Sequence, residues 1–444
     1  MQELSLRQRI TVLAAAFLGW MFGGLQIALF VLIHRPAMLS LLGVSPATMT
    51  PEAAALNEQT ITHWFAWYQA AFLLGAASGG WIFGMLGDRF GRTKSLAASI
   101  LCYSVLTGAC YFARSPWELL VLRFLACHGI GGAWPNTVAL VAEAWPAASR
   151  PLLAGVLGTA ANVGQVAMGL LGLGFDVTVD SWRWTFLAGA APAAIGVWCL
   201  VCVPESVRWQ LSRLQQAASW QGPIRELFRP PLRSRTIMGI LLGTIPVIGT
   251  AANAQWIVPW SDQVQTQQLK VSAEDKSDPT AAAARPKPDP KSKARTMVSR
   301  SGGAVIGSLL GGILASFLGR RTTYFFISLL ALGASTWIFG WLTPLHPWFL
   351  WASFGFGLIG VIYFGWLPLY LPELFPTAVR ASGTGISFNS GRVLAAGVVL
   401  GTGVLVKLFG GDYARIGLWT GMIYGAGMLL ILFAPRTDAG SLQD

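Results

Sequence analysis

GMLGDRFGRTK, residues 84–94, decides the fold of this chain. It places one acid and three bases within eleven residues, directly after residues 70–83, which carry no charge. Glycines at 84, 87 and 91 would allow close helix approach and a tight turn. The pattern marks a point where an apolar helix leaves a membrane and the chain turns back.

Composition supports a membrane protein. Hydrophobic residues make up 54% of the chain and charged residues 11%, whereas soluble proteins have about 25% charged residues. A membrane-spanning helix needs roughly 20 apolar residues. The sequence predicts an all-α protein with twelve such spans, at about 10–33, 64–85, 95–113, 116–142, 152–174, 184–203, 236–259, 301–318, 323–343, 347–370, 384–408 and 414–434.

The first apolar run follows two arginines but is too long for a cleaved signal peptide, so we interpret it as a retained helix. The cysteines all fall in predicted spans without a metal-ligand pattern, so we expect them to pack and we expect no metal or cofactor. A catalytic Ser/His/Asp set, a paired-carboxylate set and an ATP-binding loop are absent from the sequence, which argues against an enzyme or a primary pump.

The net charge of +12 follows the membrane topology. With the N-terminus inside, the inner segments carry sixteen Lys and Arg residues and the short outer loops carry five. Basic residues favour the cytoplasmic side, so both termini are predicted to be cytoplasmic. We expect a multi-pass protein of the bacterial inner membrane that contacts the lipid bilayer, works as a monomer and binds no nucleic acid.

Two polar stretches divide the chain. Residues 210–235 form a predicted cytoplasmic loop between a first half, residues 1–209, and a second half, residues 236–444. Residues 261–300 form a long polar outer loop, expected to be flexible, with binding of anionic lipids or an acidic partner as the alternative.

The two halves are related as repeats. Gly84, Gly91 and Arg92 recur 228 residues later as Gly312, Gly319 and Arg320. EAWPAASR from Glu143 recurs 230 residues later as ELFPTAVR from Glu373. Transporters built from repeats place the substrate at the interface between them, near the bilayer midplane.

These motifs resemble the major facilitator superfamily. GMLGDRFGR resembles the motif that this superfamily carries between spans 2 and 3. PESVRW, RFLACHGIGGAWP and ELFPTAVRASGTG resemble its sugar porter, organic ion, aromatic acid and sialic acid branches. The resemblance implies two six-helix bundles that move about a central site by alternating access.

The resemblance also implies a cytoplasmic gate. Asp88 is expected to meet the start of helix 11 near Ser382–Gly385, with Ser382 as the helix cap. Ion pairs within the motifs are expected between Glu143 and Arg150, Glu205 and Arg208, and Glu373 and Arg380. The predicted gate residues are Gly84, Asp88, Arg89, Gly91, Arg92, Glu143, Arg150, Glu205, Arg208, Gly319, Arg320, Glu373 and Arg380, with topology alone as the alternative role for Arg89. Ser316 stands where Asp88 would repeat, so the gate is expected to be asymmetric.

Two arginines lie deep inside predicted spans. Arg123 is in span 4 and Arg392 in span 11, and the nineteen acids all fall in loops or near span ends. Unpaired buried cations are costly, so an organic anion is the expected ligand. The predicted substrate site contains both arginines and the following polar or aromatic residues, each of which could instead form a helix–helix contact: Gln26, Trp134, Asn162, Gln165, Asn253, Trp256, Tyr363 and Asn389.

His128 is a possible coupling group, although a packing role is expected by default. In similar families helix 1 carries acids in a W-x-x-D-G-x-D arrangement, where this chain has Gly23 and Gln26. The sequence therefore predicts a secondary transporter of a small organic anion, with uniport or exchange favoured over carboxylate-based proton symport. The alternatives are an exporter of amphipathic compounds, a proton-coupled sugar or organic acid symporter, and a non-transporting membrane sensor or assembly partner.

Overall fold

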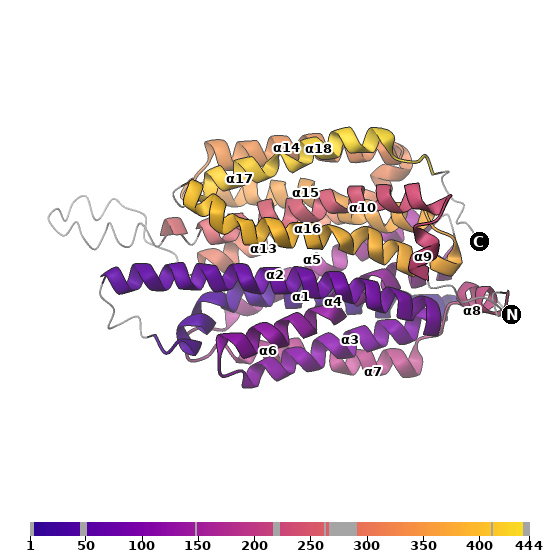
Figure 1. Ribbon diagram of the computed structural model, residues 1–444, viewed down its shortest axis with the longest axis horizontal. Helices are drawn as coiled ribbons and strands as arrows, with labels where there is room; N and C mark the ends of the chain where they lie inside the picture. Colours follow the sequence, from indigo (N-terminus) through magenta and orange to yellow (C-terminus); the bar gives the residue numbers. More distant parts are fainter. Residues whose placement is uncertain are drawn as a thin grey trace.

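The computed structural model describes residues 4–44, 51–146, 149–215, 223–261, 263–265, 291–409 and 412–437. Long helices lie side by side, and both chain ends are at the same end of the bundle (Figure 1). That end is named the inner end here, because the charge distribution predicts that it faces the cytoplasm. Among the described residues, ten helices are long and apolar enough to cross a membrane.

The first half contains α1 (Leu6–Leu41), α2 (Pro51–Phe90), α3 (Arg92–Ala109), α4 (Pro116–Ala144), α5 (Arg150–Gly174), α6 (Trp184–Ala190) and α7 (Ala193–Cys202). The short helices α8 (Val207–Gln215) and α9 (Pro223–Leu227) follow at the inner end. The second half contains α10 (Leu232–Ile248), α13 (Ser292–Phe317), α14 (Arg320–Trp341), α15 (Phe349–Glu373), α16 (Arg380–Leu408), α17 (Tyr413–Gly421) and α18 (Ile423–Leu430).

Helices α4 and α16 are each 29 residues long. At 1.5 Å per residue each reaches about 43 Å, which is enough to cross a bilayer. All twelve predicted spans overlap these helices, with span 6 divided between α6 and α7 and span 12 between α17 and α18.

The start of span 8 was predicted too late. Helix α13 begins at Ser292, so the last nine residues of the predicted 261–300 loop are helical and Arg300 lies more than two turns inside the helix. The three basic residues before Arg300 made this stretch look like a loop, although a helix can continue past the membrane surface. Residues 262 and 266–290 of the predicted loop lie outside the described residues.

The two halves contact each other along two helix pairs, α2 with α16 and α5 with α13. Glycines allow both pairs to approach closely. A Cβ atom added at Gly80 would lie 2.0 Å from the Asn389 Nδ2, and one added at Gly155 would lie 2.3 Å from the Leu309 carbonyl oxygen. At Gly155 the obstacle is backbone, so α5 and α13 could not keep their present spacing with a larger residue there, whereas at Gly80 the Asn389 side chain would have to move.

The repeat is visible in backbone and side-chain geometry. Gly91 and Gly319 precede α3 and α14 with φ values of 115° and 84°. The arginine that follows each glycine pairs with the repeated glutamate of the same half, Arg92 with Glu143 at 3.3 Å and Arg320 with Glu373 at 2.9 Å. Equivalent residues 228 and 230 positions apart thus have equivalent partners.

The glycine turns give a first prediction. Gly91→Ala would force a side chain into a backbone region that glycine favours, at a cost of about 1–3 kcal/mol, and would place a Cβ atom 2.1 Å from the Glu205 Oε2. Gly319→Ala carries the same backbone strain but has no atom within 4 Å of the added Cβ. Thermal unfolding in detergent should show a larger loss of stability for Gly91→Ala, and equal losses would contradict this account.

Candidate functional site

The Asp88 carboxylate joins the two halves at the inner end. Its Oδ2 accepts hydrogen bonds from the Ser382 backbone N–H, at 2.8 Å, and from the Ser382 hydroxyl. Its Oδ1 accepts from Arg92 Nη1 at 2.5 Å. Ser382 lies in the first turn of α16, where backbone N–H groups have no partner within the helix. Asp88 therefore caps a helix of the opposite half.

Glu143 lies beside this contact and also connects the halves. Its Oε1 is 3.3 Å from Arg92 Nη2 and 3.4 Å from Arg380 Nη1, and its Oε2 accepts from the Ser206 hydroxyl at 2.5 Å. Arg92 Nη2 also donates to the Thr377 carbonyl at 3.0 Å. The charged groups of Arg92, Glu143 and Arg380 are fully buried. Removal of one member of such a cluster leaves an uncompensated buried charge, which costs about 3–5 kcal/mol.

Glu205 caps a helix of its own half. Its Oε1 accepts from the backbone N–H groups of Arg92 at 2.9 Å and Thr93 at 3.2 Å, at the start of α3. Burial raises the pKa of the Glu205 carboxyl, and the hydrogen bonds from these backbone N–H groups oppose the shift. The close contact with Gly91 explains why that position excludes a side chain.

The structure shows gate contacts that the sequence did not predict. Glu143 is shared by Arg92 and Arg380, and Glu373 pairs with Arg320 and accepts from the Thr437 hydroxyl at 2.6 Å. The sequence prediction paired residues that are close in the chain. It missed these contacts because helix ends that are far apart in the sequence meet at the inner end. Ser382 was predicted as the cap of helix 11, but α16 begins two residues earlier, so Ser382 receives a cap from Asp88.

The remaining gate residues lie nearby at the inner end. Gly84 packs against α16, where an added Cβ would lie 3.2 Å from the Ala381 carbonyl oxygen. The Arg89 guanidinium lies 4.9 Å from the Phe90 ring centroid, and Arg208 is in the first turn of α8.

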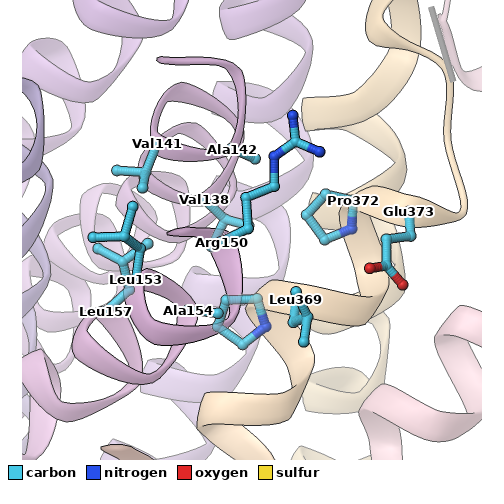
Figure 2. Close-up of a pocket in the computed structure, with 11 residues that line it drawn as sticks. Val138, Val141, Ala142, Arg150, Leu153, Ala154, Leu157, Leu369, Pro372 and Glu373 are labelled. Carbon is cyan, nitrogen blue, oxygen red and sulfur yellow. The ribbon is translucent and has the colours of Figure 1, made fainter. Parts of the chain in front are cut away.

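A narrow cavity lies between α4 and α5 of the first half and α15 of the second half, close to the inner end. Figure 2 shows the Arg150 guanidinium on one wall and the Glu373 carboxylate on the other. The remaining lining residues are apolar. This cavity is separate from the two deep arginines, since neither lines it.

Arg123 lies deep in α4 and is 2% exposed. Its Nη1 donates to the Gln26 carbonyl at 3.2 Å, and its guanidinium carbon lies 3.9 Å from the Phe30 ring centroid. The Arg123 Nε and Nη2 atoms are buried without a hydrogen-bond partner. The Gln26 side chain donates to the Gly189 carbonyl at 2.6 Å, and its Oε1 has no partner. Unsatisfied buried donors are rare in native proteins and indicate a place for a ligand or water.

Arg392 lies in α16 and is 4% exposed. Its Nη1 donates to the Asn389 Oδ1 at 2.8 Å, so the two predicted neighbours share one helix face. Its guanidinium carbon lies 4.9 Å from the Phe388 ring centroid and 5.7 Å from the Phe72 ring centroid. The Arg123 guanidinium carbon is 5.4 Å from the same Phe72 ring, so one phenyl ring links the two arginines.

Trp134 continues this cluster toward α1. Its ring lies 5.0 Å from Trp20 and 4.9 Å from Phe388, and its indole Nε1–H is buried without a partner. Arg123, Gln26, Trp134, Asn389 and Arg392 are thus gathered around Phe72 and Phe388. This group is named the arginine–aromatic cluster below.

Two other predicted substrate residues lie at the α5–α13 contact. Asn162 Nδ2 donates to the Ser308 hydroxyl at 3.0 Å. Gln165 Oε1 accepts from Arg300 Nη2 at 3.1 Å. Both contacts connect the two halves, as expected for helix–helix hydrogen bonds in a membrane.

The last three predicted substrate residues lie within the second half. The Asn253 Nδ2 donates to the Gly417 carbonyl at 2.6 Å, and its Oδ1 accepts from the Ser335 hydroxyl at 3.2 Å. The Tyr363 hydroxyl is 2.7 Å from that of Ser328, and Trp256 packs on Tyr413. Asn253 and Tyr363 thus have partners in their own half, whereas the Trp256 Nε1–H is buried without one.

His128 does not face the arginine–aromatic cluster. Its Nδ1 is 3.0 Å from the Phe124 carbonyl and its Nε2 is 3.0 Å from the Ser78 hydroxyl. Both ring nitrogens therefore contact polar groups, one of α4 and one of α2. This geometry suits a packing histidine.

Sequence reasoning missed Phe30, Phe72, Phe388 and Arg300. The three rings are ordinary apolar residues in apolar helices, and only the fold shows that they surround guanidinium groups. Arg300 was assigned to a loop. Its position eight residues after the start of α13 places it about 12 Å along that helix.

A bundle of apolar helices, with buried ion pairs joining two repeats at one end and buried arginines without an acidic partner in the contacts described, is typical of a membrane transporter. The model of the "Sugar (and other) transporter" family matches residues 37–225. The cis,cis-muconate transport protein of Acinetobacter baylyi is 30% identical over 73% of this chain and 74% of its own length. The probable 4-methylmuconolactone transporter of Cupriavidus pinatubonensis is 27% identical over 84% of this chain and 82% of its own length.

The fold is similar to that of the proton:xylose symporter XylE, a structure of the major facilitator superfamily. The TM-score is 0.68 at 18% identity, over 98% of each chain. The chain belongs to the major facilitator superfamily of transporters. The predicted superfamily, its fold and the absence of an enzymatic role are thereby confirmed.

The unequal halves give a second prediction. Asp88→Asn removes the charge that pairs with Arg92 and weakens the contact with α16, so uptake into proteoliposomes should fall several-fold. Ser316 occupies the repeated position, and its hydroxyl donates only to the Ile313 carbonyl of its own helix. Ser316→Ala should therefore transport like the unaltered protein. Similar losses in both variants would show that the inner-end contacts are not dominated by the first half.

Proposed function

We propose that this protein transports a small organic anion across the bacterial inner membrane, as a monomer and by alternating access. The anion's carboxylate binds in the arginine–aromatic cluster. The inner-end contacts of Asp88 and Glu143 close the path to the cytoplasm in the conformation described here. They break when the two six-helix bundles move and open the inner end.

The unpaired donors of Arg123 carry this proposal. Arg123 and Arg392 have only neutral partners among the contacts described above, the Gln26 carbonyl and the Asn389 amide. Within the described part of the chain, acidic side chains lie near the ends of the helices or outside them. A carboxylate ligand would supply charge-assisted hydrogen bonds, which are about twice as strong as neutral ones.

The relatives support the substrate class. Proteins named for the transport of cis,cis-muconate and 4-methylmuconolactone match over most of this chain. Both relatives are bacterial, which supports a bacterial inner membrane as the location. A sugar has no charge to offset buried guanidinium groups, so the likeness to a xylose symporter extends to the fold alone.

We further propose uniport or anion exchange rather than proton symport through a carboxylate. Gly23 and Gln26 of α1 stand where related transporters carry acids, and Gln26 binds Arg123 and Gly189. His128 has both ring nitrogens occupied. Neither position presents a carboxylate to the arginines.

The arginines give a third prediction. In a thermal-shift screen of purified protein, organic acids should stabilise the protein, because ligands that bind only the folded state raise its stability. Arg123→Ala and Arg392→Ala should each weaken the shift and lower uptake by at least about tenfold, as expected for the loss of a charge-assisted contact. Arg415→Ala is the matched control, because this arginine is exposed and bonded only to Asp412 in the contacts described.

Stabilisation by organic cations alone would contradict an anion substrate. Ligand binding without saturable uptake in proteoliposomes would instead favour a membrane sensor. An unchanged thermal shift in both arginine variants would move the binding site elsewhere, and the Arg150–Glu373 cavity would be the next candidate.

Coupling gives a fourth prediction. Uptake of the anion by proteoliposomes should continue after an ionophore collapses the pH gradient, because the arginine–aromatic cluster contains no carboxylate that could carry a proton. Preloading the vesicles with the same anion should accelerate uptake if the protein exchanges anions. Abolition of uptake by the ionophore would establish proton coupling and refute this part of the proposal.

A further inference from the structure

We propose that the substrate is a dianion, a short planar dicarboxylate whose two carboxylates bind Arg123 and Arg392 at the same time. This inference rests on the proposed function and adds the charge and shape of the ligand. The inference also distinguishes ligands that bind without being transported from ligands that are transported.

The first step is the position of the two guanidinium groups. Their distances of 5.4 Å and 5.7 Å from the centroid of the Phe72 ring place them within about 11 Å of each other. Arg123 belongs to α4 of the first half and Arg392 to α16 of the second half. The two cations therefore come from opposite halves and approach the same phenyl ring.

The second step is the charge. Each guanidinium carries one full positive charge and cannot release its proton in a protein. A monoanion would compensate one guanidinium and leave the other buried with the neutral Asn389 amide or Gln26 carbonyl as its polar partner. A dianion compensates both, and buried ions persist only when they are paired.

The third step is the shape of the ligand. A charge-assisted hydrogen bond between an arginine nitrogen and a carboxylate oxygen spans about 2.8 Å. The skeleton between the carboxylates must therefore be short to fit between the two arginines. Aromatic rings of Phe30, Phe72, Phe388 and Trp134 line this region. Flat ligand surfaces stack on such rings, so a conjugated or aromatic skeleton fits better than a saturated one.

The fourth step links charge to transport. A ligand shifts a conformational equilibrium only by its difference in affinity for the two states. A monoanion held by one arginine contacts one half and favours neither closure nor opening. A dianion spans both halves and draws them together around the site. Monoanions of the same skeleton should thus bind as inhibitors and be transported poorly.

The experiment compares three diacids, each with its own monomethyl ester: fumarate, cis,cis-muconate and terephthalate. Ester formation keeps the skeleton and removes one charge. In proteoliposomes, at least one diacid should be taken up about tenfold or more faster than its ester, as expected from the loss of one charge-assisted contact. The same ester should competitively inhibit uptake of its diacid, which shows that it still binds.

Variants test the assignment of the second carboxylate. Arg392→Gln should slow uptake of the diacid to the rate of the ester and should slow the ester much less, because the removed carboxylate and the removed cation are partners. Arg415→Gln should keep the full difference between diacid and ester. If the ester still inhibits the Arg392→Gln variant, that variant is folded. If Arg392→Gln misfolds, Arg392→Lys replaces it and should keep part of the difference between diacid and ester.

The outcomes separate the two proposals. Equal uptake of diacids and esters would overturn the dianion inference and leave the proposed transport of organic anions intact. Equal sensitivity of diacid and ester to Arg392→Gln would also overturn the inference. Absence of uptake and of inhibition for every acid and ester would refute the proposed function itself.

Discussion

The structure depends on a buried cluster of charges at its inner end. Glu143 is shared by Arg92 of its own half and Arg380 of the other half, and Asp88 caps the first turn of α16 while it binds Arg92. Buried charges are stable only with partners and hydrogen bonds. The cluster therefore holds the two repeats together at the inner end. In the proposed mechanism, these contacts are exchanged for water when the halves move apart.

Charges in the centre of the bundle follow a different pattern. Asp88, Glu143 and Glu373 at the inner end are paired with arginines, whereas Arg123 and Arg392 meet carbonyl and amide oxygens and the faces of aromatic rings. Cation–π contacts contribute about 0.5–2 kcal/mol each, which is less than a buried charge costs. The missing negative charge connects the fold to a function, since a substrate can supply it during transport.

Much of the fold could be predicted from the sequence, because a bilayer requires membrane-spanning helices to be apolar and about 20 residues long. The long apolar helices, the turn at Gly91 and the contact between Asp88 and the start of helix 11 come from apolar runs and from motifs shared with a known superfamily. The pairings of Glu143 and Glu373 could not be predicted, because side chains from the ends of several helices meet at the inner end and sequence distance does not rank them. Phe72 is unremarkable in a helix rich in apolar residues, and only the packing of α2 between α4 and α16 makes it the shared neighbour of two arginines.

The central claim is that an organic anion provides the charge that Arg123 and Arg392 lack. A structure determined with a transported organic acid tests it most directly. The account predicts carboxylate oxygens within hydrogen-bonding distance of the Arg123 Nε or Nη2 and of the Arg392 guanidinium, beside the Phe72 ring. An acid bound instead between Arg150 and Glu373, with both deep arginines still facing only neutral groups, would contradict it.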